Sequence, residues 1–250
     1  MRCLSRLLIC YMVFHMMIYS QDEPTLDGDL TDEFWLSAST FSDFLEYSPR
    51  IGSQAAEKTI VLLKPGNNFL YIGFKVYSAK PIIANVMERD QPLTDDDFIE
   101  IVIDSYNNHT DALSFQTNML GTRVDYELSE NVTVKNKSWN TIWDVETRRT
   151  DYGWSAEFRI PFASLRFQSS ENVTMGFKFI RQLAADNSFV VYPLTDQNVD
   201  NALYNLNFAE PISLGNIDVK QRLLLSPYIV GNLQNRHDLN QPADAYTSST

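Results

Sequence analysis

Strict alternation of apolar and polar side chains between Trp154 and Ile160 most constrains how this chain folds. The apolar positions are every second residue: Trp154, Ala156, Phe158 and Ile160. This period of two is typical of a β-strand that buries one face. Residues 143–149 alternate in a similar way, and Tyr152-Gly153 supplies turn residues between the two segments. The stretch therefore predicts a long antiparallel hairpin near the centre of the domain.

Other short segments with strand patterns follow one another, with frequent turn residues between them. The predicted strands are 58–63, 69–77, 98–104, 112–118, 124–128, 175–183 and 189–192. A short helix is expected after Thr31 as its N-cap, with Phe34 and Trp35 plugging one end of the fold. Helical periodicity does not extend beyond one or two turns. The pattern predicts an all-β fold, an antiparallel β-sandwich with one short N-terminal helix.

The two ends of the chain differ from this central part. Residues 1–20 combine a basic start with an apolar run, a pattern typical of a signal peptide. Cys3 and Cys10 both lie in this segment, so the mature chain offers neither a disulfide nor a thiolate metal site. Residues 21–217 are assigned to the sandwich. A new strand-like run begins at Val219, so residues 218–250 are expected to start a further segment.

The charge of the mature chain limits its partners. Without the first twenty residues, 18 basic residues face 32 acidic ones, which gives a net charge of −14. Such a surface argues against nucleic acid and against anionic membranes as partners. An acidic exported protein that is rich in Tyr and Phe is better suited to neutral ligands or cations.

Catalytic motifs are absent from the sequence, which has no nucleophile elbow, phosphate-binding loop or H-E-x-x-H motif. Paired carboxylates of the kind that glycosidases use are the one catalytic option, with Glu100 and Glu157 as candidates. Any associated activity would then be hydrolysis of O-glycosyl bonds. Acids on the solvent face of a sheet are the simpler interpretation, so the sequence favours a protein that is not an enzyme.

A calcium site is more plausible than catalysis. Asp95, Asp96 and Asp97 place three carboxylates in a row before a predicted strand. Calcium prefers oxygen ligands of this kind, which makes them candidate ligands of a structural Ca²⁺. The run lacks the spacing of an EF-hand loop, and solvated loop acids are the alternative interpretation.

A binding face is the remaining option, because sugars present flat C–H patches flanked by hydroxyl groups. Aromatic rings beside planar polar groups suit such ligands. Trp139 lies in a polar segment and is the tryptophan least explained by core packing, although rim packing on the hairpin is its alternative. Tyr71 and Tyr126 are further candidate rings, and Arg89 and Asn118 are candidate polar contacts.

Four segments carry motifs that extend this interpretation. They are LDGDLTDEFW (26–35), a segment ending in DDDFIEIVID (89–104), FQTNMLGTRVD (115–125), and the tryptophan-rich hairpin ending in IPFASLRF (139–167). Together they resemble family 9 carbohydrate-binding-module-like domains, in the version found at the N-terminus of large outer-membrane proteins of Gram-negative bacteria. The resemblance covers about residues 24–215 and implies a jelly-roll-like sandwich. It also implies export to the cell envelope, on either side of the outer membrane, with a membrane β-barrel in the same chain starting within 218–250.

The resemblance implies non-catalytic carbohydrate binding in polysaccharide breakdown or uptake. Sugar-binding members clamp a terminal sugar between two aromatic rings and hold calcium structurally. No pair of tryptophans here matches that clamp, because Trp35, Trp143 and Trp154 fall in motifs that are architectural. Two alternatives therefore stay open: a plug or interaction domain of the barrel without sugar affinity, and a glycoside hydrolase that uses Glu100 or Glu157.

Overall fold

The computed structural model describes residues 23–196, 198–199 and 202–217. The predicted signal peptide and the predicted start of a barrel from residue 218 lie outside these residues. Within the described part, no helix combines the length and the apolar composition that a membrane crossing requires.

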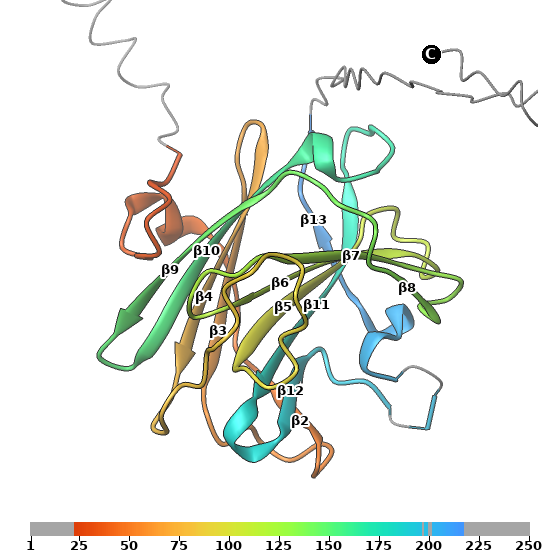
Figure 1. The fold of residues 1–250 in the computed structure, drawn as a ribbon. Helices are drawn as coiled ribbons and strands as arrows, with labels where there is room; N and C mark the ends of the chain where they lie inside the picture. Colours follow the sequence, from red (N-terminus) through yellow and green to blue (C-terminus); the bar gives the residue numbers. More distant parts are fainter. Residues whose placement is uncertain (1–22, 197, 200–201, 218–250) are drawn as a thin grey trace, which may run out of the picture. The chain divides into compact units, whose positions relative to one another are not determined.

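In the described residues, thirteen strands form two antiparallel sheets, whose arrangement Figure 1 shows. The five-stranded sheet has the order β1-β3-β4-β10-β9, from β1 (Ser39–Phe41), β3 (Thr59–Pro65), β4 (Phe69–Tyr77), β9 (Asp144–Thr150) and β10 (Gly153–Pro161). The eight-stranded sheet has the order β2-β12-β11-β5-β6-β7-β8, and β13 pairs with the first half of β11. Its strands are β2 (Leu45–Ser48), β5 (Phe98–Asp104), β6 (Ala112–Asn118), β7 (Val124–Ser129), β8 (Val134–Asn136), β11 (Thr174–Leu183), β12 (Ser188–Tyr192) and β13 (Glu210–Ser213).

Five short 3₁₀ segments complete the described part. They are η1 (Glu33–Ser37), η2 (Phe162–Ser164), η3 (Ala184–Asp186), η4 (Ala202–Tyr204) and η5 (Leu206–Phe208). The predicted antiparallel β-sandwich with one short helical segment near its start is therefore confirmed.

The predicted hairpin is also confirmed, but it lies at one edge of the five-stranded sheet, where β9 is the last strand. β10 pairs along its whole length with β4 and on its other side with β9. Its apolar positions face the core, where Phe158 stacks almost parallel to Trp143 with ring centroids 5.7 Å apart. The hairpin tryptophans Trp143 and Trp154 are both buried, so the ring system stabilises the fold rather than a ligand.

One hydrophobic core fills the space between the two sheets. The eight-stranded sheet contributes alternate residues of β5 and β11, among them Ile99, Ile101, Phe177 and Phe179. All four are fully buried. Full burial of such a side chain stabilises the fold by roughly 1.5–3 kcal/mol, so this core is the main source of stability.

The N-terminal helix differs from the prediction in its cap and in its place. Asp32, and not Thr31, is the N-cap residue, and no side chain caps the helix. Phe34 and Trp35 do not plug the end of the sandwich. They pack on Tyr71 on the outer face of the five-stranded sheet, with the Phe34 and Tyr71 centroids 5.1 Å apart. The reason is that this face of β4 is itself apolar and needs a cover.

Candidate functional site

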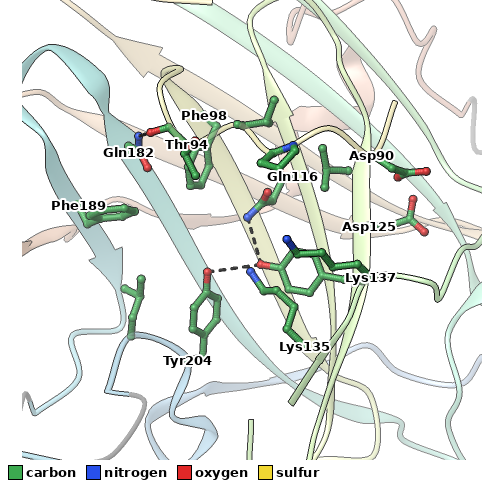
Figure 2. A pocket seen from close by; sticks show the side chains of 15 residues that line it. Asp90, Thr94, Phe98, Gln116, Asp125, Lys135, Lys137, Gln182, Phe189 and Tyr204 are labelled. Atoms are coloured by element: carbon green, nitrogen blue, oxygen red, sulfur yellow. Dashed lines mark hydrogen bonds between the residues drawn. The ribbon is translucent and has the colours of Figure 1, made fainter. Parts of the chain in front are cut away.

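A pocket of about 250 Å³ lies on the outer face of the eight-stranded sheet (Figure 2). Its lining side chains alternate along their strands with residues of the core. Phe98 precedes the core residue Ile99, and Gln182 precedes Leu183. Six strands (β5, β6, β7, β8, β11 and β12) and η4 contribute to the lining, so the pocket exists only once the sheet has assembled.

Four aromatic rings form much of the pocket wall: Phe98, Tyr126, Phe189 and Tyr204. Phe98 and Phe189 meet edge to face with centroids 6.3 Å apart. Phe189 and Tyr204 are only partly buried, so they remain partly accessible from solvent. A wall of this kind can pack against flat C–H surfaces of a ligand.

A buried carboxylate beneath the rings fixes two of them. Glu100 is fully buried, and its Oε1 accepts hydrogen bonds from Ser114 at 2.6 Å and from the Tyr126 hydroxyl. Its Oε2 accepts a hydrogen bond from the Tyr204 hydroxyl at 3.2 Å. Burial, and then the charge of Glu100, raises the pKa of both tyrosines well above the usual range, so both hydroxyls stay protonated as donors. The two rings are thus positioned before a ligand arrives, which reduces the entropy cost of binding.

Two planar amides complete the polar part of the lining. Gln116 Nε2 donates to the Tyr126 hydroxyl at 3.1 Å, and Gln182 Nε2 donates to the carbonyl of Thr94 at 2.5 Å. Among the hydrogen bonds of the described residues, none reaches Oε1 of either glutamine. Each amide is therefore oriented by the protein and keeps an acceptor for a ligand hydroxyl.

Acidic groups at one side of the pocket are held by a single guanidinium. Asp125 Oδ1 accepts hydrogen bonds from Arg89 Nη2 at 2.8 Å and from Trp143 Nε1 at 3.0 Å. Asp90 Oδ2 lies 3.4 Å from Arg89 Nε. Arg89 also donates to Asn140 Oδ1 at 2.7 Å, which fixes the guanidinium among protein partners.

Two basic residues also line the pocket. Lys135 lies in β8 and Lys137 just after it, and both are exposed and line the pocket. The ammonium of Lys135 lies 3.7 Å from the centroid of the Tyr126 ring, in a cation–π contact. Figure 2 labels both lysines among the side chains that line the pocket.

This chain matches the model of a known protein family. The model described as "carbohydrate family 9 binding domain-like" matches residues 26–207. The chain belongs to this family. No curated protein matches it.

Three solved structures are similar to this chain. A family 9 carbohydrate-binding module from Caldicellulosiruptor kristjanssonii in complex with cellotriose is 20% identical; the match covers 82% of this chain and 96% of that one, with a TM-score of 0.49. Its complex with glucose gives 18% identity, the same coverage and a TM-score of 0.48. A candidate carbohydrate-binding protein from Bacteroides uniformis is 10% identical, with 70% and 86% coverage and a TM-score of 0.58, which shows a shared fold.

In this family 9-like domain, three of the five predicted ligand residues lie at or behind the pocket. Tyr126 lines it. Arg89 lies behind the wall, where it holds Asp125. Asn118 is fully buried, and its Nδ2 donates to the carbonyl of Val86 and to Asp96 Oδ2, both at 2.8 Å. Asn118 therefore fixes a loop and does not face the pocket.

The other two predicted ligand residues lie away from the pocket. Tyr71 belongs to the five-stranded sheet and is 1% exposed beneath Phe34, so its ring has no open face. Trp139 is half-buried and packs edge to face on the core residue Phe115, with centroids 6.2 Å apart. The structure thus does not bring the five predicted residues together in one site.

The aspartates predicted as calcium ligands have separate surroundings. Both oxygens of Asp96 accept two hydrogen bonds each, from the backbone and side chain of Asn85 and from Val86 N and Asn118 Nδ2. A carboxylate offers about four acceptor positions, so none remains for a cation. Asp97 accepts from the backbone of Ile83 and Ala184, and Asp95 is exposed. This donor set does not fit the predicted Ca²⁺.

The described residues offer no other grouping of this kind. Nowhere among them do three or more His, Cys, Asp or Glu side chains gather in a way that could hold a metal ion. The loop aspartates instead tie the chain before β5 to its neighbours.

The two glutamates considered for catalysis lie on opposite outer faces of the sandwich. Glu157 alternates with core residues of β10, and Glu100 alternates with core residues of β5. Packed sheets are about 10 Å apart. Glu100 and Glu157 point outward from opposite sheets, so their carboxylates are farther apart than the two sheets. The two catalytic carboxylates of a glycosidase lie roughly 5–9.5 Å from each other, on either side of the bond that is cleaved. This geometry does not support a catalytic pair of Glu100 and Glu157.

Sequence reasoning did not identify most of the pocket residues, among them Phe98, Gln116, Gln182, Phe189 and Tyr204. One signal was available: β5 carries large apolar side chains on both faces, since Phe98 and Val102 alternate with the core isoleucines. Apolar residues on both faces of a strand indicate that its outer face is also covered or used.

Proposed function

We propose that this domain binds carbohydrate without catalysis, in the pocket on the outer face of the eight-stranded sheet. Membership of the family 9-like group supports the class of ligand. The observation that carries the proposal is the wall of four aromatic rings beside two oriented amides. The rings suit the C–H faces of a sugar, and the amide oxygens suit its hydroxyl groups.

We also propose that the domain is exported to the cell envelope and serves polysaccharide breakdown or uptake there, in association with the outer membrane. The signal-like pattern of residues 1–20 and the motif resemblance support this placement. A barrel in the same chain is part of this proposal and stays a prediction.

Calorimetric titration of the full chain with cello-oligosaccharides and with xylan, each with and without Ca²⁺, tests the proposal. Saturable binding of at least one of these glycans is expected. Phe189→Ala should weaken it by roughly tenfold, because a lost contact ring removes on the order of 1–2 kcal/mol of apolar burial. Tyr106→Ala is the matched control, since Tyr106 is 49% exposed and does not line this pocket.

Two results would contradict the proposal. Equal effects of Phe189→Ala and Tyr106→Ala would mean that the pocket is not the site. Absence of binding to every glycan would favour the alternative of a structural or interaction domain. A requirement for Ca²⁺ would show that an ion is held by ligands other than the fully engaged Asp96.

A further inference from the structure

The mouth of the pocket is basic, although the chain is acidic. The whole sequence has 20 basic and 32 acidic residues and a net charge of −12. Lys135 and Lys137 nevertheless both line the pocket. Lys135 lies in β8 and Lys137 follows its last residue, while Asn136 between them bonds to Glu127. Within the described ranges, neither lysine forms an ion pair with a carboxylate.

The acidic groups around the pocket are already engaged. Asp90 and Asp125 both pair with Arg89, at 3.4 Å and 2.8 Å. Glu100 lies beneath the rings, fully buried, and accepts hydrogen bonds from three hydroxyl groups. A ligand that enters the mouth therefore meets two ammonium groups without a direct anionic partner.

The surroundings of the Lys135 ammonium favour the binding of an anion. The residue as a whole is exposed, but its ammonium group lies against the rings of Tyr126 and Tyr204, 3.7 Å and 5.3 Å from their centroids. This local desolvation lowers the pKa of Lys135; the charge of Glu100 acts in the opposite direction, and that of Lys137 lowers the pKa further. A bound anion would offset the repulsion between the two lysines.

We infer that the pocket takes an acidic carbohydrate, a sugar with a carboxylate such as a uronic acid residue. The carboxylate binds between Lys135 and Lys137, and the sugar ring packs on the half-buried rings of Phe189 and Tyr204. This inference rests on the proposed function and narrows its ligand class. Lysines on an edge strand also hinder unwanted strand pairing, but that role needs only exposure and not a place in a pocket wall.

Calorimetry on the full chain with three matched trisaccharides tests the inference. The probes are cellotriose, its C6-oxidised uronate form and its C6-sulfated form. The uronate should bind roughly fivefold more tightly than cellotriose at low salt, which corresponds to about 1 kcal/mol for one partly exposed ion pair. High salt should reduce this preference, because it screens exposed charges.

Substitutions of the lysines test which residues cause the preference for the uronate over cellotriose. Lys137→Gln should remove the preference for the uronate over cellotriose. Lys58→Gln is the control, because Lys58 is exposed and precedes β3 of the other sheet. Lys135→Gln is the second variant, and it should also reduce the preference.

The outcomes separate the inference from the proposed function. If no trisaccharide binds, the proposed function fails. If cellotriose binds and the uronate binds no more tightly, or if the preference survives both lysine variants, the inference alone is overturned. A preference for the sulfated form without one for the uronate also overturns the assignment of a carboxylate.

Discussion

Glu157 illustrates, at the scale of one residue, how a buried carboxylate fixes a remote segment. Its oxygens accept hydrogen bonds from the backbone of Asp27 and Gly28 and from Trp35 Nε1, at 2.9, 2.8 and 2.9 Å. The sequence predicted Glu157 as one polar position of an alternating strand. It could not predict these partners, because they lie more than a hundred residues away.

Glu157→Gln should therefore destabilise the fold. The amide replaces one acceptor oxygen with a donor that faces other donors, and leaving buried groups unpaired costs about 2 kcal/mol. Denaturant unfolding measures the loss. Glu146→Gln is the matched control, since Glu146 lies directly opposite on β9 and is exposed. Equal stabilities of the two variants would contradict this role of Glu157.

Lys178 is a second buried charge, on the outer face of β11. Its Nζ donates to Thr195 Oγ1 at 2.6 Å and to the carbonyl of Pro193 at 3.3 Å. Burial lowers the pKa of Lys178 from its ordinary 10.5 to about 7. Between these two values the unfolded chain binds a proton that the folded chain does not. The contribution of Lys178 to the free energy of unfolding therefore rises with pH, on the order of 1 kcal/mol per pH unit.

Lys178→Met should accordingly stabilise the protein most below pH 7, where the folded state must hold the buried charge. Its advantage over the unsubstituted chain should shrink as the pH rises from about 7 towards 10. Urea unfolding of both proteins over this range measures the difference, with the exposed Lys58→Met as the control. An advantage that is constant with pH would contradict the assignment.

At the scale of elements, Gly153 sets the start of the β10 ladder. Its φ is +145°, and a Cβ there would lie 2.2 Å from the carbonyl oxygen of Val76. Gly153→Ala must therefore separate β10 from β4, and we expect a loss of more than about 2 kcal/mol in the free energy of unfolding. Gly121 has a φ of +76°, but a Cβ added there would meet no atom nearer than 3.6 Å. Gly121→Ala should therefore cost only about 1 kcal/mol of backbone strain in the free energy of unfolding. Thermal unfolding of both variants compares them, and equal losses would show that the contact with Val76 is unimportant.

Element prediction succeeded where alternation extends over five or more residues. β4, β5 and β6 have the predicted bounds, and most of the other predicted strands differ by one or two residues at an end. β1, β2, β8 and β13 were not predicted, because three or four residues do not establish a period of two. Their positions depend on pairing with distant strands, as β1 pairs with β3 and β2 with β12.

For the whole molecule, the family and the sandwich could be predicted, but most of the site could not. Motifs are local in sequence, whereas the pocket joins side chains from Phe98 to Tyr204 across the strand order of one sheet. Tyr126 was one of two further candidate rings, and the other, Tyr71, is buried in the other sheet. Trp139 was chosen for its polar sequence neighbours, and these gave no sign that its ring would pack on Phe115.

Mapping of backbone amide shifts by NMR during titration with a cello-oligosaccharide tests the central claim most directly. The account predicts that the largest shifts gather on the outer face of the eight-stranded sheet, around Phe98, Gln116, Tyr126, Gln182 and Tyr204. Shifts centred on Trp139 or on the outer face of the five-stranded sheet, or no shifts at saturating sugar, would contradict it.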